Sequence, residues 1–509
     1  MSTEAYSAGA SSTGAPAAGA YASEERQAEI LEHFGYEQEL YREMGWFSSF
    51  AASFSGVSIT TGVLLTLPFV LTQSGTGGLW TWVISAFGCL LIAAIFADLA
   101  GRIPLAGYAY QWASRLTNPN FGWFVAVCGL IGFGVGAAGT AYGVTPYFLD
   151  EFGIEATRNA TILGAAALTL LVMLINIAGI RIATTFNNAA VVTEIVGGVG
   201  VAIALLVYAI VEHPHPASFL FHQQPGVHGA YIGAFLLAFL LGAYTFAGWE
   251  LPADLAEETR NATTVTQRTI IASVIAVAVS GLILLVGFSY ASPGISKTLG
   301  EEHPVLSIIQ YQWGTTGRQL VDILFLISFV SVVLLIQAGA ARLLFSLGRD
   351  NMAPFGTFFG RVSGRFKTPY TALIGTAVFG IAMFTVPALI SAKVLEYIIG
   401  TASVGFNLVY GLIAGVYLFL SYRGTLPKQF GKFSLGRWGK PIAWVSLIWQ
   451  IFLVGTLTLP KINFKIGVTT LAMLAVGAVW FLVWVRPKVK AGQAGPHREV
   501  AVKELETAA

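Results

Sequence analysis

Apolar residues come in long runs along the chain, and short polar segments separate these runs. A helix needs about 20 mostly apolar residues to cross the hydrocarbon core of a bilayer. Runs of that kind lie at residues 46–72, 79–99, 120–148, 160–180, 186–210, 229–253, 269–292, 318–347, 370–389, 394–420, 440–459 and 465–485. The pattern predicts an all-α membrane protein with twelve transmembrane helices, numbered here as spans one to twelve.

The composition supports this class and argues against several others. Hydrophobic residues make up 55% of the 509 residues and charged residues 11%, whereas a soluble protein carries about 25% charged residues. The net charge is +2 without a basic cluster, so the lipid bilayer is an expected partner and nucleic acid is not. We find no nucleotide-binding loop, catalytic triad or zinc-type spacing, and therefore expect no enzyme, no metal site and no cofactor.

Lysine and arginine residues in the loops predict the orientation, because cytoplasmic loops carry more of them. One set of loops holds Arg102, Arg115, Arg181, Arg260, Arg268, Arg342, Arg349, Arg361, Arg365, Lys367, Arg423, Lys428, Lys432, Arg437 and Lys440. The opposite set holds only Arg158, Lys297, Arg318, Lys393, Lys461 and Lys465. The bias predicts a multi-pass protein of the plasma membrane with both termini in the cytoplasm.

Three segments outside the spans are polar. Residues 1–23 are mostly Ala, Ser, Gly and Thr, so we expect a disordered tail. Residues 24–45 are expected to form a cytoplasmic polar helix that leads into span one. Residues 486–509 are expected to be a loose cytoplasmic tail.

Span six is interrupted where a spanning helix should be continuous. Its last part reads Tyr244-Thr-Phe-Ala-Gly-Trp-Glu250-Leu-Pro252. Lipid offers no partner for freed backbone groups or for a charge, so such a break must face protein or a water-filled cavity. An interrupted span with a carboxylate indicates the binding site of a transporter.

Span one carries a matching irregularity at Phe54-Ser-Gly-Val-Ser58-Ile-Thr-Thr-Gly62, with two glycines and four hydroxyls in nine residues. Small residues also let spanning helices approach closely, so helix packing is the alternative interpretation. Breaks in spans one and six are the expected pattern of an inverted repeat with a site at mid-membrane.

Several motifs together resemble a known group. They are Phe34-Gly-Tyr-Glu-Gln-Glu-Leu-Tyr-Arg42, Phe54-Ser-x-x-Ser58-x-x-x-Gly62, Ala97-Asp-Leu-Ala-Gly-Arg-Ile-Pro104, Asn176-Ile-Ala-Gly179-Ile-Arg181, Gly248-Trp-Glu250, Arg342-Leu-Leu-Phe-Ser-Leu-Gly-Arg349-Asp350 and Phe433-Ser-Leu-Gly-Arg-Trp-Gly439. The sequence resembles the amino acid–polyamine–organocation (APC) superfamily, closest to its amino acid/choline branch, over about residues 31–485.

The resemblance implies a five-plus-five inverted repeat (a LeuT-like, APC-type fold), with repeats at 46–210 and 229–420 and two C-terminal helices at 440–485. It also implies a secondary active transporter that moves an amino acid by alternating access. A carrier or exchanger of an amine (choline, ethanolamine, a polyamine or 4-aminobutyrate) is the alternative. A channel or a transporter-like sensor is more remote, since no charge ring or filter motif is visible.

The substrate site is expected at the two breaks. The predicted substrate-binding residues are Ser58, Ile59, Thr60, Thr61, Gly62, Tyr244, Phe246, Gly248 and Glu250. Backbone N–H groups near Thr60, Thr61 and Gly62 begin a half-helix, and a helix N-terminus favours an anion such as a substrate carboxylate. We therefore expect a zwitterionic amino acid, whose amino group binds carbonyls near Ser58, Tyr244 and Phe246. The resemblance also places an aromatic lid, or gate, at Tyr244.

The expected coupling-ion residues are Glu194, Glu250, Ser328 and Ser331. Proton-coupled relatives carry a lysine at the position of Glu194, and many relatives carry Asp at the position of Glu250. A neutral carboxylic acid costs less than an ion in an apolar helix, which favours a coupling proton over sodium. The alternatives are a structural acid at Glu194 without a coupling role, and a Glu250 that only braces the unwound backbone.

Overall fold

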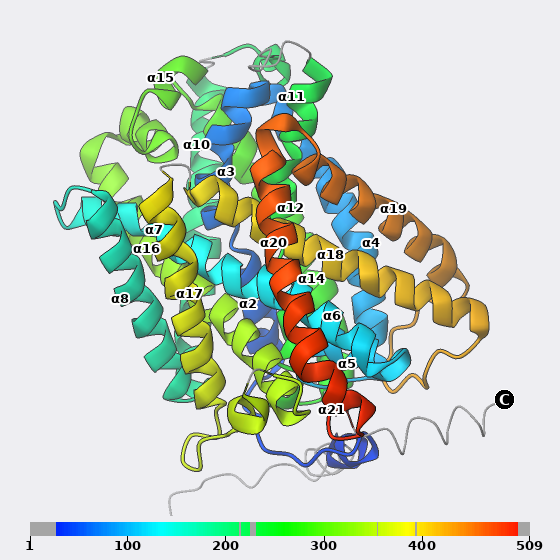
Figure 1. The fold of residues 1–509 in the computed structure, drawn as a ribbon. Coiled ribbons are helices and arrows are strands. Elements are labelled where there is room, and N and C mark those ends of the chain that lie inside the picture. Colours follow the sequence, from blue (N-terminus) through cyan, green and yellow to red (C-terminus); the bar gives the residue numbers. More distant parts are fainter. Residues whose placement is uncertain (1–26, 213–214, 224–230, 354, 392–393, 497–509) are drawn as a thin grey trace, which may run out of the picture.

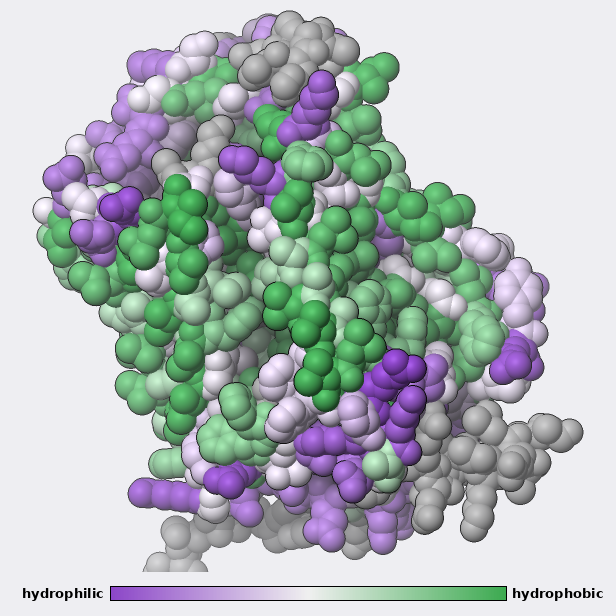
Figure 2. Space-filling model, viewed as in Figure 1, coloured by the Kyte–Doolittle hydropathy of each residue, from purple (hydrophilic) through white to green (hydrophobic). Residues whose placement is uncertain are grey.

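The protein is a bundle of helices (Figure 1). The computed structural model describes residues 27–212, 215–223, 231–353, 355–391 and 394–496; the tail expected at 1–23 lies outside them. Within these ranges the one extended pairing is an isolated parallel bridge between Met44 and Thr259. Hydrophobic side chains form a broad band across the middle of the face in Figure 2, and polar side chains gather at both ends. This confirms the expected all-α membrane class.

Among the described residues, eleven helices are long and apolar enough to cross a bilayer, and the shorter apolar segment Tyr231–Thr245 falls within the expected span six. Spans one to five are α2 (Trp46–Val57) with α3 (Ile59–Ser74), α4 (Thr81–Arg102), α6 (Pro119–Leu130) with η2 (Ile131–Val135) and α7 (Gly136–Glu151), α8 (Arg158–Ile177), and α9 (Ile180–Thr193) with η3 (Glu194–Val199) and α10 (Gly200–Glu212). The segments expected as spans six to twelve correspond to α11 (Tyr231–Leu237) with α12 (Phe239–Thr245) and α13 (Leu251–Asp254), α14 (Ala262–Tyr290), α16 (Pro304–Arg349), α17 (Tyr370–Ile390), α18 (Val394–Arg423), α19 (Gly439–Thr458), and α20 (Phe464–Trp480) with η9 (Phe481–Val485) and α21 (Arg486–Lys490).

The prediction of a helix at residues 24–45 is wrong over most of that range. The described residues are helical only over 27–33, and Gly35 then adopts φ 78°, which ends the helix. Residues 36–43 continue without helix, and the backbone of Met44 bonds to the segment after span six: Met44 N–H donates to Glu258 O at 3.0 Å. These backbone bonds replace the helical ones.

Two other boundaries differ from the expectation. Span eight, expected at 318–347, belongs to α16, which begins at Pro304 and contains a kink at Gly314, where φ is 69°. The tail after residue 485 is not loose at its start. It begins with α21, and Gly495 N–H then donates to Asp350 O at 2.9 Å, so residues up to 496 are held against the end of α16.

The two breaks lie against each other. Span one is interrupted at a single residue, Ser58, in a left-handed conformation with φ 41°. Span six is interrupted over residues 246–250, and Gly248 has φ 92°. A Cβ added to Gly56 would lie 2.7 Å from Gly248 O, so both glycines are required for the close approach of the two backbones. The break in span one is therefore confirmed, while Gly56 itself serves packing.

Candidate functional site

The carboxylate of Glu194 lies at the break in span one. Glu194 is 2% exposed and begins the π-helical segment η3, a local distortion that is frequent at functional sites. Its Oε1 accepts hydrogen bonds from Ser58 Oγ at 3.2 Å, Thr60 N–H at 3.2 Å and Thr60 Oγ1 at 2.8 Å. A Cβ on Gly198 would lie 2.9 Å from Thr60 Cγ2, so this glycine lets span five approach span one. The structure therefore brings Glu194 of span five to the break in span one.

The donors expected to bind a substrate carboxylate already have partners. Thr60 N–H donates to Glu194, Thr61 N–H lies 3.4 Å from Ser58 Oγ, and Gly62 N–H makes the first bond within α3, to Ser58 O at 2.9 Å. The expectation of unpaired N–H groups here is wrong for this conformation, because the carboxylate of the protein itself occupies the N-terminus of α3. Ile59 is the first residue of that half-helix.

The two span-eight serines belong to different clusters. Ser328 Oγ lies 3.1 Å from Thr60 Oγ1 and 3.4 Å from Ser58 Oγ, and so joins the hydroxyls around Glu194. Ser331 Oγ instead donates to Asn187 Oδ1 at 2.7 Å and lies 3.3 Å from Ser55 Oγ. The structure therefore brings Ser328 to Glu194 but places Ser331, which the sequence assigned to the same site, in a neighbouring hydroxyl cluster.

Glu250 braces the break in span six. It is fully buried, and its Oε2 accepts Gly248 N–H at 3.1 Å and the hydroxyl of Tyr410 at 2.7 Å. The side chain thus replaces a helical partner that the broken backbone has lost. Its Oε1 is buried and has no hydrogen-bond partner within the described part of the chain. This geometry favours the bracing role and leaves one oxygen for a proton or a ligand.

The aromatic residues of the break connect span six to spans two and three. Tyr244 Oη lies 2.9 Å from Thr140 Oγ1, and the ring of Phe246 packs on Trp82 with centroids 4.4 Å apart. Phe246 O, expected to bind a substrate amino group, accepts the Trp249 indole N–H at 3.1 Å. A carbonyl has a second lone pair, so it can still accept another donor. A Cβ on Gly62 would lie 2.3 Å from Thr245 Cγ2, which puts the two half-helices in direct contact.

A second polar group, the terminal-end cluster, lies where the described parts of both chain termini meet. It consists of Arg342, Arg349, Glu257, Glu258 and Asp350. The Arg342 guanidinium donates to both oxygens of Glu258, at 3.1 and 2.9 Å, and Arg349 does the same to Glu257, at 3.1 and 3.0 Å. Each buried glutamate here is neutralised by its own arginine, and the pairs connect span eight to the end of span six.

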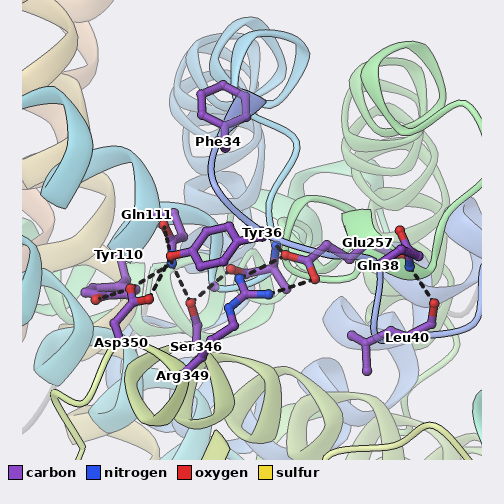
Figure 3. A network of polar contacts seen from close by, with 12 residues as sticks. Phe34, Tyr36, Gln38, Leu40, Tyr110, Gln111, Glu257, Ser346, Arg349 and Asp350 are labelled. Atoms are coloured by element: carbon purple, nitrogen blue, oxygen red, sulfur yellow. Dashed lines mark hydrogen bonds and ion pairs between the residues drawn. The ribbon is translucent and has the colours of Figure 1, made fainter. Parts of the chain in front are cut away.

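Residues 34–44, the N-terminal strap, cross this cluster (Figure 3). Tyr36 Oη donates to Asp350 Oδ1 at 2.7 Å, and its ring lies 3.7 Å from the Arg349 guanidinium carbon. Burial, and then the negative charge of Asp350, raise the pKa of the Tyr36 phenol above its ordinary value, so the hydroxyl remains a donor. Gln38 Nε2 donates to Glu257 O at 3.0 Å. The strap therefore contacts both the end of span eight and the segment after span six, the two elements that the ion pairs connect.

Sequence reasoning missed several of these residues. Thr140 and Tyr410 lie in apolar runs with no local signal, and only the fold brings them to Tyr244 and Glu250 of span six. Tyr36 was part of a recognised motif, yet its partner Asp350 is 314 residues away. Asn187 could have been found as a polar residue inside span five.

These features define a multi-pass, all-helical membrane protein in which two adjoining spans are broken, the architecture of a transporter. The chain belongs to the amino acid permease family, whose model matches residues 44–483. It is 24% identical to an uncharacterised amino-acid permease of Schizosaccharomyces pombe, over 85% of this chain and 80% of the relative. It is 22% identical to the amino-acid permease BAT1 of Arabidopsis thaliana, over 84% and 88% of the two chains. The thiamine transporter thi9 of Schizosaccharomyces pombe is also 22% identical, over 94% and 89%.

The family confirms the resemblance to the APC superfamily, and the protein is a membrane amino acid transporter of that superfamily. The family is one of permeases. The choice of substrate and of coupling ion does not follow from the family.

Proposed function

We propose that this protein is a proton-coupled secondary active transporter of an amino acid, which works by alternating access in the plasma membrane with both termini cytoplasmic. The observation that carries the proposal is the carboxylate of Glu194 at the N-terminus of α3. That position combines the Thr60 N–H donor, which bonds to the carboxylate, with the positive end of a helix dipole, and so favours one negative charge.

Coupling follows from competition for this position. When Glu194 is ionised, its carboxylate uses Thr60 N–H and repels a second anion. When Glu194 is protonated, the negative charge disappears and the Thr60 N–H can donate to the carboxylate of a substrate instead. Proton binding and substrate binding therefore favour each other, and such a coupling free energy is reciprocal.

The hydrogen bonds at Glu194 support a proton over sodium. One of the groups facing Oε1 is the backbone N–H of Thr60, 3.2 Å away, and an N–H group cannot coordinate a metal ion. The hydroxyls of Ser58, Thr60 and Ser328 lie 3.1–3.4 Å from one another, the distances of a weakly bonded hydroxyl network. Protonation changes the charge of this group without rearranging its oxygens.

The experiment is transport by the purified full-length protein in liposomes. A panel of labelled amino acids and amines is tested with a proton gradient, a sodium gradient and no gradient. We expect the wild type to accumulate an amino acid only with the proton gradient, and Glu194→Gln to exchange that substrate without accumulating it. Equal proton-driven accumulation by Glu194→Gln overturns the coupling role. Sodium-driven accumulation by the wild type overturns the choice of ion.

An amine carrier is the second candidate function. The buried, unpartnered Oε1 of Glu250 at the span-six break favours it, because a carboxylate there would attract a cation. One of the relatives is a thiamine transporter, and thiamine is a cation. Transport of an amine that carboxylated analogues do not inhibit would select this function.

A further inference from the structure

We propose that an anionic phospholipid binds in a groove between spans ten and eleven, the α18–α19 groove, and that it supports the span-six break from the membrane side. The groove has a volume of about 560 Å³ and lies between α18, α19 and the start of α6. Its lining includes Leu408, Gly411, Gly415, Phe419, Leu447 and Ile451. The inference goes beyond the proposed function, and uses from it only the cytoplasmic orientation of the termini.

The length and lining of the groove fit one acyl chain. Along α18 the groove extends from Asn407 to Phe419, twelve positions further along the helix, or about 18 Å. One leaflet of the hydrocarbon core is about 15 Å thick. Gly415 leaves the groove open, since a Cβ added there would have nothing within 4 Å. Phe419 and Ile451 are 48% and 65% exposed on the flank that faces the bilayer.

Cations lie at the mouth of the groove, where a lipid headgroup would be. The guanidinium of Arg423 lies 4.8 Å from the ring of Phe419, which lines the groove. Lys440 precedes the lining residue Leu447 by seven positions, so both lie on one face of α19. Residues 419–446, which include Arg423 and Lys440, contain no acidic residue that would repel an anionic headgroup. A basic pocket between helices on the cytoplasmic side is typical of an anionic lipid site.

The inner wall of the groove is shared with the transport site. Asn407 Nδ2 donates to Ser403 O at 2.7 Å and to Ala243 O at 3.4 Å, and Ala243 precedes Tyr244 in span six. Asn407 and Gln450 also line a small cavity together with Phe246 and Tyr410. Gln450 is 3% exposed, and its Oε1 has no hydrogen-bond partner among the described residues. A lipid in the groove would therefore press on residues that hold the span-six break.

Native mass spectrometry of the full-length protein tests the proposal. The protein is titrated with phosphatidylglycerol or with phosphatidylcholine of the same chain length, and bound lipid is counted. We expect one tight phosphatidylglycerol, bound about ten-fold more weakly by Gly415→Leu, which fills the groove. Gly200→Leu is the matched control, because Gly200 also lies in a spanning helix and, as at Gly415, an added Cβ would have no atom within 4 Å.

A pair of charge variants tests the headgroup separately and leaves the membrane-embedded surface intact. Arg423→Gln/Lys440→Gln should lose the preference for phosphatidylglycerol, while Lys428→Gln/Lys432→Gln, with the same loss of charge, should keep it. Equal lipid binding by the wild type, Gly415→Leu and Arg423→Gln/Lys440→Gln overturns the site. Equal retention of the two lipids by the wild type overturns the anionic headgroup. A wild-type dimer that Gly415→Leu abolishes in either lipid would show that a second copy of the chain occupies the groove, and would also overturn the proposal.

Discussion

The buried carboxylates at the two breaks differ from those of the terminal-end cluster in their partners. Glu257 and Glu258 each receive two hydrogen bonds from one arginine. Glu194 and Glu250 are equally buried, but their partners are hydroxyls and backbone N–H groups. A paired charge stays ionised and holds two elements together, whereas an acid without a basic partner can change its protonation state at lower cost. A carboxylate paired with an arginine suits a gate, and a buried acid without a basic partner suits a coupling site.

Removal of an arginine from the terminal-end cluster should have the largest effect. Arg342→Gln leaves Glu258 buried without a basic partner. This destabilises the arrangement in which span eight is paired with the end of span six by about 3–5 kcal/mol. We expect faster hydrogen exchange in α13, measured by mass spectrometry on the full-length protein. Arg361→Gln, on an arginine that lies over the ring of Phe358, is the control. Wild-type exchange in Arg342→Gln would contradict a gating role for the pair.

Removal of the Tyr410 hydroxyl should have the next largest effect, and it acts at the breaks. Tyr410→Phe deletes the 2.7 Å hydrogen bond to Glu250, a loss of about 1.5–3 kcal/mol for a bond to a charged acceptor. The expected result is weaker substrate binding in equilibrium titrations. The double variant Tyr410→Phe/Glu250→Gln should bind substrate only slightly more weakly than whichever single variant binds it more weakly. Additive losses would mean that the two side chains act independently.

The N-terminal strap offers a smaller and more selective test of the terminal-end cluster. Tyr36→Phe removes the hydrogen bond to Asp350 and keeps the ring on Arg349. Because Asp350 keeps its bonds from Tyr110 and Gln111, we expect the contact between the strap and the terminal-end cluster to lose about 1.5 kcal/mol, the low end for a bond to a charged acceptor. Tyr41→Phe is the matched control, because Tyr41 lies in the same strap and is 49% exposed. The measurement is the rate of substrate efflux from loaded liposomes. Identical rates in the two variants would show that the strap does not hold the gate.

The proposed lid gives the smallest expected effect of the four. Tyr244→Phe removes only the contact with Thr140 and should cost under about 1 kcal/mol in apparent affinity. Tyr244→Ala should impair transport more, because the ring that would cover the substrate is lost. Transport kinetics tests both variants. Wild-type kinetics in Tyr244→Ala would reject the lid.

The spans and the breaks could be predicted because they depend on local sequence. Apolar length gave span nine as 370–389, and α17 runs from Tyr370 to Ile390. Glycine, proline and a carboxylate in one run likewise located the break in span six. Prediction from local sequence failed where contacts between distant segments determine the structure. The segment 36–45 has polar helical composition but bonds to residues 258–260 instead. Ser331 has the same residue type as Ser328 but lies one turn away, beside Asn187.

The most direct test of the central claim is the pH dependence of substrate binding to the wild type and to Glu194→Gln. The substrate is an amino acid that the liposome panel identifies, and its dissociation constant is measured in detergent without a gradient. If a proton on Glu194 frees the N-terminus of α3, wild-type affinity falls as the pH rises through the titration of that acid. Glu194→Gln then binds with an affinity that does not change over the same range. The same fall in affinity in both proteins would contradict the account.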